Sequence, residues 1–265
     1  MTEPAAVALA PRFLAASTRD RHHRHLAALA GTAAWTMEQA SFTTTATSTC
    51  GHVTLHADRT ASNNEAHLFL HARTRPGAAS RWSVTLGGEL PVEFLASMTT
   101  VLTAELLRDP DYILYGLPQD GRPFTLEAPD WDAWQYHDDR GLLEWRTRHG
   151  GSKAAAIMRG RESSAPPLAG GENTFVMAAA TVPWAGRPEV LWWAAFSHGT
   201  PPAVVGTFIN DLLSPEPVVR TARDLPRPEL LPLLDISPLT TPARPAPPVP
   251  RGGRDPGPGR RREGR

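Results

Sequence analysis

One stretch, Arg81–Leu102 with the sequence RWSVTLGGELPVEFLASMTTVL, decides the fold because the chain contains it twice. The second copy, Leu191–Leu212, reads LWWAAFSHGTPPAVVGTFINDL. The matched pairs are Trp82 with Trp192, Leu86 with Phe196, Pro91 with Pro201, Phe94 with Val204, Leu95 with Val205, Met98 with Phe208 and Leu102 with Leu212. The copies align without a gap, which predicts two related structural units.

The repeated stretch has the pattern of a strand, a tight turn and an amphipathic helix. Apolar and polar side chains alternate over Trp82–Leu86, which is the period of a strand with one buried face. Gly87-Gly88 ends the strand, and Pro91 suits the first turn of a helix, where no backbone N–H is needed. The apolar positions then recur at helical spacing. They are Phe94, Leu95, Met98, Val101 and Leu102.

Strand and helix signals along the rest of the chain predict an α+β fold of two related repeats. Each repeat has about four antiparallel strands followed by a C-terminal helix. The first, residues 11–108, has a helix over Pro11–Ala30, strands over Phe42–Thr49, His52–Asp58, Ala66–Arg73 and Arg81–Leu86, and a helix over Pro91–Leu107. The second, residues 133–214, has strands over Leu142–Thr147, Ala154–Arg159, Thr174–Val182 and Val190–Phe196, and a helix over Pro201–Leu213. Residues 109–132 form a connector, in which Tyr112–Tyr115 is a candidate short strand.

The two ends of the chain are predicted to be poorly ordered. Met1–Ala10 is expected to form a loose arm. Residues 215–265 hold about half of the chain's 27 prolines and are expected to form a mostly disordered Pro/Arg-rich tail. Within this tail, Glu229–Leu234 is a candidate for one docked turn of helix.

Composition excludes several classes of protein. The formal net charge of the 265 residues is zero, so no global field attracts nucleic acid or an anionic membrane. The single cysteine, Cys50, excludes an internal disulfide and a cysteine-rich metal site. No apolar run reaches the roughly 18 residues of a membrane span, and the N-terminus lacks the basic region of a signal peptide. A cytoplasmic location without membrane contact is therefore predicted.

The common catalytic motifs are missing. The sequence has no glycine-rich dinucleotide fingerprint after a strand, no phosphate-binding loop, no Gly-x-Ser-x-Gly elbow and no His-Glu-x-x-His. A non-enzymatic protein without a cofactor is therefore favoured, and an enzyme of unrecognised type stays open. Such an enzyme would need a polar pocket between the repeats.

Histidines are the sharpest local feature. Strand alternation predicts one open sheet face that carries His52, His56, His67 and His71. Paired imidazoles can bind a divalent metal, but no Asp or Glu completes the set, so a solvated, pH-responsive polar face without metal is favoured. The run Arg19–His25 is interpreted in the same way, as the solvated start of a helix.

The outward sheet face of the second repeat is apolar, unlike that of the first. It carries Phe175, Met177 and Trp193, and Phe69 is the large apolar residue on the corresponding face of the first repeat. The apolar face packs against the first repeat or the connector, or it forms a ligand or partner surface with Trp193 as an anchor. The acidic and aromatic residues over Asp130–Asp139 are interpreted as an exposed turn region.

Several of these features together resemble a known family. They are Phe13–Ala15, the helix that ends at Ala34-Trp35, the segment Thr47–Leu55 and the unit Trp82–Leu102. In order and spacing they resemble an actinobacterial family, the domain of unknown function 317, also called SPDY after a Ser-Pro-Asp motif. The resemblance implies tandem copies over Pro11–Leu213, a polar or basic tail and no catalytic residues. Ser48-Thr49-Cys50 stands here in place of the motif.

Two functional hypotheses follow. The first is a non-enzymatic binding or regulatory module that acts on a protein partner, or on a second copy of itself, through its sheet faces and tail. The second is single-stranded nucleic-acid binding, because tandem strand-and-helix repeats look like the Whirly and PUR proteins. Phe69 and Trp193 would then stack on bases and Arg81 would contact phosphate. The part of the chain before Pro215 has slightly more acidic than basic residues, which disfavours the second hypothesis.

Overall fold

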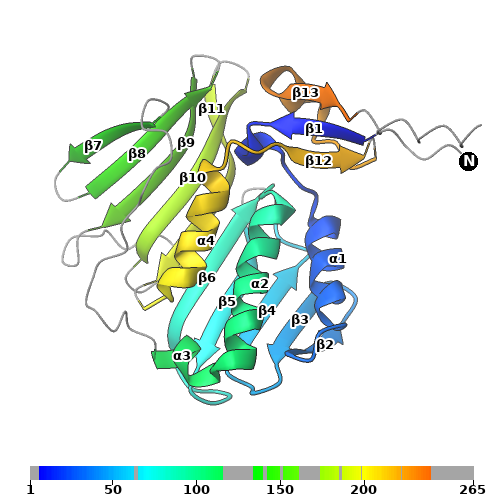
Figure 1. The fold of residues 1–265 in the computed structure, drawn as a ribbon, viewed down its shortest axis with the longest axis vertical. Coiled ribbons are helices and arrows are strands. Elements are labelled where there is room, and N and C mark those ends of the chain that lie inside the picture. The colour runs from blue at the N-terminus through cyan, green and yellow to red at the C-terminus, as the bar shows by residue number, and fades with distance from the viewer. Residues whose placement is uncertain are drawn as a thin grey trace, which may run out of the picture.

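The protein has an α+β fold, as the sequence predicts, and its strands form two antiparallel sheets (Figure 1). The computed structural model describes residues 6–62, 65–115, 134–139, 142–149, 152–160, 174–184, 187–197, 199–221 and 223–239. The predicted connector therefore lies largely outside the described residues, as do residues 240–265 of the predicted tail.

The larger sheet has ten strands in the order β2-β3-β4-β5-β6-β11-β10-β9-β8-β7. The first five are β2 (Trp35–Gln39), β3 (Thr43–Ser48), β4 (Val53–Asp58), β5 (Ala66–Arg73) and β6 (Ser80–Gly88). The others are β7 (Trp134–Asp139), β8 (Leu142–His149), β9 (Ser152–Gly160), β10 (Thr174–Trp184) and β11 (Arg187–Ser197). The two sets of five join edge to edge through β6 and β11, where Thr85 lies opposite Ala195.

Helices cover one face of this sheet (Figure 1). They are α1 (Arg19–Leu29), α2 (Val92–Arg108), α3 (Pro110–Tyr115) and α4 (Pro202–Leu213), with a 3-10 turn η1 (Arg12–Leu14) before α1. Helices α2 and α4 pack against each other over the junction of the two sets of strands. Phe94 of α2 and Phe208 of α4 make edge-to-face contacts with each other and with Trp192 of β11, so an aromatic cluster forms the centre of the core.

The two tryptophans that the sequence repeat matches are both fully packed and hydrogen-bonded. Trp82 donates its indole N–H to the carbonyl of Ile113 in α3 at 2.7 Å. Trp192 donates its indole N–H to the carbonyl of Phe13 in η1 at 2.8 Å. Each buried polar N–H therefore has a partner, supplied once by α3 and once by η1.

The smaller sheet has the order β12-β1-β13 and joins the two ends of the chain. Strand β1 (Ala6–Ala10) pairs antiparallel with β12 (Val218–Thr221) on one side and β13 (Asp235–Pro238) on the other. Between β12 and β13 lies the 3-10 helix η3 (Pro228–Leu233), which confirms the turn predicted within Glu229–Leu234. Residues 6–10, 218–221 and 228–238 thus belong to defined elements and their links, and the predictions of a loose arm and of a tail starting at 215 are wrong there.

Two further predictions are corrected. Each set of strands has five members, because β2 and β7 extend the sheet beyond the four expected. Strand β2 is mostly exposed at the sheet edge, so its sequence lacks the alternation that marks a half-buried strand. Tyr112–Tyr115 belongs to helix α3 rather than to a strand, because the Asp109 carboxylate accepts the Asp111 amide at 3.1 Å and caps the helix start.

Candidate anion-binding site

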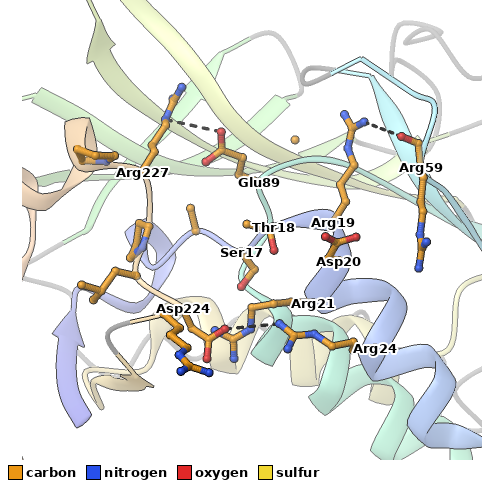
Figure 2. A pocket seen from close by; sticks show the side chains of 16 residues that line it. Ser17, Thr18, Arg19, Asp20, Arg21, Arg24, Arg59, Glu89, Asp224 and Arg227 are labelled. Atoms are coloured by element: carbon orange, nitrogen blue, oxygen red, sulfur yellow. Dashed lines mark hydrogen bonds and ion pairs between the residues drawn. The ribbon is translucent and has the colours of Figure 1, made fainter. Parts of the chain in front are cut away.

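A cavity of about 870 Å³ lies between three segments that are distant in sequence. Its walls come from the start of α1, the end of β6 and the segment that links β12 to η3, and Arg59 of the β4–β5 loop adds to the lining (Figure 2). The charged residues that line it are Arg19, Arg21, Arg24, Arg59, Arg223 and Arg227, with Asp20, Glu89 and Asp224. Among the lining residues six guanidinium groups thus accompany three carboxylates, and Glu189, outside the lining, lies 3.7 Å from Arg227, so cationic side chains are in excess.

The start of α1 reinforces this positive charge. Thr18 is the N-cap residue, and its side chain makes no capping hydrogen bond. The uncapped N-terminus carries the positive end of the helix dipole, where cationic side chains are unfavourable. Arg19, Arg21 and Arg24 nevertheless lie in the first two turns. A bound anion would offset both the dipole and the guanidinium charges.

Several ion pairs connect the cavity walls. Arg24 of α1 lies 3.5 Å from the Asp224 carboxylate, and Arg227 lies 3.6 Å from that of Glu89 (Figure 2). Arg19 donates to the carbonyl oxygens of Ala61 and Ser62 in the β4–β5 loop. These contacts hold the three segments around the cavity without neutralising all of its arginines.

Arg21 is a cavity arginine with an unpaired nitrogen. Its Nη1 atom is buried and has no hydrogen-bond partner among the described residues. Burial and the nearby charge of Arg220 lower the pKa of Arg21. Because buried polar groups are nearly always hydrogen-bonded, this unpaired nitrogen leaves Arg21, which lines the cavity, with unused capacity to donate a hydrogen bond.

A buried ion pair between β12 and α2 lies next to the cavity wall. Arg220 of β12 is 1% exposed and donates to both carboxylate oxygens of Glu93, one of them at 2.7 Å. The same guanidinium reaches the carbonyl of Ala15 at 3.1 Å. Ser17, which lines the cavity, accepts the backbone N–H of Val92 at 2.9 Å. The link between η1 and α1 is thereby tied to the start of α2 and to the small sheet.

The cavity carboxylates have different electrostatic environments. Burial raises the pKa of Glu89, and the neighbouring Arg227 opposes that effect. The pKa of Asp224 is lowered, because its carboxylate accepts the Thr221 hydroxyl at 2.9 Å. Asp224 is therefore a fixed structural anion, whereas Glu89 is a partly desolvated acceptor.

The prediction of four histidines on one open face is wrong for His67. The ladder between β5 and β6 has a register shift between Ala66 and Leu68, and this bulge turns His67 toward α1, where it is fully buried. Its Nε2 lies 3.0 Å from Nδ1 of His22, whose own Nε2 lies 2.8 Å from the carbonyl of Leu90. A carbonyl only accepts, so His22 donates to Leu90, accepts from His67 and is neutral, and burial lowers the pKa of His67 and favours its neutral form as well.

The solvated helix start predicted for Arg19–His25 is also wrong in part. His22 and His23 are buried, and His23 bonds the Thr44 hydroxyl at 2.8 Å. His25 is half-buried and bonds the Thr99 hydroxyl at 2.8 Å. The basic residues of this run turn toward the cavity, while its histidines pack against the sheet and α2.

The other three histidines stay on the opposite side of the large sheet from the helices. His56 bonds the Thr45 hydroxyl at 3.0 Å, and His52 bonds the carbonyl of Arg73 at 3.2 Å. Phe69 lies between His56 and His71, with ring centroids 6.4 Å apart in both pairs. This face is therefore an interlocked set of half-buried rings rather than free imidazoles.

The predicted apolar surface lies partly on that same face. Met177 of β10 and Trp193 of β11 are half-buried neighbours, because Met177 pairs with Ala195, two positions along β11 from Trp193. The indole of Trp193 lies against Gly87 of β6, its direct partner across the junction. Trp193 thus packs on the first set of strands. The side chain of Phe175 is outside the described residues, as are Asp130, Trp131 and Asp132.

No group of three or more His, Cys, Asp or Glu side chains among the described residues is arranged to hold a metal ion. In the same part of the chain, no helix has the length and hydrophobicity that a membrane span requires.

The arginine cavity was missed by sequence reasoning, although a signal exists. Arginines in the first turns of a helix interact unfavourably with the helix dipole, so several of them there indicate a compensating anionic group. Arg59 and the Arg223–Arg227 segment join them only through the fold, so their contribution has no local pattern in the sequence.

No protein-family model matches the chain, and neither the curated proteins nor the solved structures contain a match.

Proposed function

We propose that the protein is a non-enzymatic binding module whose arginine-lined cavity holds an anionic small molecule. The observation that carries this proposal is the excess of arginine around one cavity at an uncapped helix N-terminus. Guanidinium groups and free helix N–H groups are the donors that proteins use for phosphate and carboxylate. A regulatory role would follow if the ligand changes the stability of the small sheet, which forms one wall.

A small ligand is favoured over a nucleic acid by the shape and charge of the molecule. The cavity volume falls in the range of about 300–1,000 Å³ that is typical of small-molecule sites. A polymer would need a basic track, whereas acidic residues slightly outnumber basic ones before residue 215. The stacking candidates Phe69 and Trp193 are half-buried, which leaves less ring surface for bases.

The test is isothermal titration calorimetry with pyrophosphate at low ionic strength. Arg21→Gln should weaken binding by about tenfold, because a charge-assisted hydrogen bond to an oxyanion is lost. Arg108→Gln, a charge deletion in α2 outside the cavity lining, is the matched control and should bind normally. Absent binding, or binding that ignores Arg21, would contradict the proposal. Oligonucleotide binding that depends on Trp193 rather than Arg21 would put the nucleic-acid hypothesis in its place.

We also propose that the two sets of five strands are related repeats, consistent with the resemblance to the SPDY family. The strand order is mirrored about the β6–β11 junction. Thr85 and Ala195, which occupy the same position in the two sequence copies, lie directly opposite each other there. That register is expected of two similar units related by a local twofold axis. A cytoplasmic location belongs to the same proposal, since the exposed free thiol of Cys50 suits a reducing compartment.

A further inference from the structure

We propose that the cavity ligand is a phosphate monoester that also carries hydrogen-bond donors, with its phosphate on the Arg21 and Arg24 wall and its donors on Glu89. The inference rests on the proposed anion-binding function and adds the class of ligand. Two sources share this chemistry, a sugar phosphate and a nucleotide. The arrangement of the cavity walls supports it in three steps.

The first step is the wall formed by α1. Among the described residues, one guanidinium nitrogen of Arg21 has no hydrogen-bond partner, and Arg24, whose side chain is largely exposed, pairs with Asp224 at 3.5 Å. The uncapped backbone of α1 begins beside them at Thr18. A phosphate has enough acceptor oxygens for two guanidiniums and a helix N-terminus together, which a single carboxylate cannot match.

The second step is the wall that carries Glu89. Figure 2 shows Glu89 and Arg227 on the side of the cavity opposite Arg24 and Asp224. The Nε atom of Arg227 lies 3.6 Å from Oε1 of Glu89, which makes an ion pair but is too long for a hydrogen bond, and the same guanidinium also pairs with Glu189 at 3.7 Å. A carboxylate only accepts hydrogen bonds and would repel a phosphate. This wall therefore suits a part of the ligand that is uncharged and donates, such as a hydroxyl or a ring N–H.

The third step is the size and surface of the space between the two walls. Leu225, Pro226 and Pro228 contribute apolar surface to the lining. An inorganic phosphate would occupy only a small part of about 870 Å³ and would leave this surface in water. A sugar or a nucleoside attached to the phosphate would cover it and would reach Glu89.

Calorimetry with four probes tests the inference: inorganic phosphate, glucose 6-phosphate, AMP and glucose. At least one organic phosphate should bind about tenfold tighter than inorganic phosphate, and glucose alone should not bind measurably. Glu89→Gln should remove most of that advantage and leave the affinity for inorganic phosphate unchanged or higher. Which of the two organic phosphates binds tighter identifies the source.

Separate outcomes overturn the inference and the function beneath it. Equal affinities for inorganic and organic phosphates, or an organic preference that survives both Glu89→Gln and Glu89→Ala, would overturn the ligand class while anion binding stands. Failure of every phosphate to bind, in a protein whose circular dichroism and melting are normal, would overturn both. Glu105→Gln, outside the cavity lining, is the matched control for the carboxylate changes.

Discussion

At the scale of single residues, the neutral pair formed by His22 and His67 has the largest electrostatic consequence. Burial lowers the pKa of His22 to about 3 and that of His67 to about 4, from an ordinary value of 6.5. Burial also lowers the pKa of His23 and His25. The unfolded chain therefore binds protons near pH 6.5 that the folded chain does not bind until the pH is much lower.

This difference predicts a loss of stability in mild acid. The stabilisation is complete above pH 6.5 and is lost as the pH falls through 6.5 toward 4, at about 1.4 kcal/mol per pH unit for each proton taken up. Urea unfolding at pH 7, 6 and 5 should show this slope. His67→Gln should lower the slope of the unfolding free energy against pH by about 1.4 kcal/mol per pH unit, which is the contribution of one proton. A free energy of unfolding that is constant between pH 7 and 5, or a slope that His67→Gln leaves unchanged, would contradict the prediction.

At the scale of elements, the strands and helices with a clear apolar pattern could be predicted from the sequence, and irregularities within them could not. Strand β5 was expected at Ala66–Arg73 and lies there. Its bulge between Ala66 and Leu68 has no sequence signal, yet it moves His67 from one face of the sheet to the other. The same limit applies to β2, where an edge position removes the alternation.

The junction of β6 with β11 depends on a glycine. A Cβ atom on Gly87 would lie 2.4 Å from Nε1 and 2.5 Å from Cε2 of Trp193, which forces the indole to move. Gly87→Ala should therefore lower the free energy of unfolding by about 1–3 kcal/mol, the usual cost of overpacking.

The matched control for that prediction is the same change in a Trp193→Ala background. Without the indole the added methyl has space, so Gly87→Ala should cost less than half as much there. A double-mutant cycle from urea unfolding measures the difference. Equal costs in the two backgrounds would show that the backbone, and not the indole, requires the glycine.

At the scale of the whole molecule, the candidate site depends on contacts between the two ends of the chain, which local patterns cannot reveal. Strand β1 pairs with two strands that are more than 200 residues away in the sequence. Ala6–Ala10 therefore reads as an apolar segment with no strand close to it in the sequence that could be its partner. The cavity wall formed by Arg223–Pro228 lies between those two partner strands. The arm, the ordered part of the expected tail and the cavity are therefore one structural unit.

Deleting residues 1–10 tests that unit, because it removes the central strand of the small sheet. Leu9 is fully buried, and β12 and β13 would each lose their only pairing within that sheet. We expect the segment 214–239 to become sensitive to limited proteolysis, and pyrophosphate binding to be lost with the cavity wall. Deleting residues 1–5 keeps β1 whole and should change neither property. If the larger deletion leaves residues 214–239 protected, then Arg220 and its ion pair with Glu93 hold the segment, and the strand pairing is dispensable for the cavity.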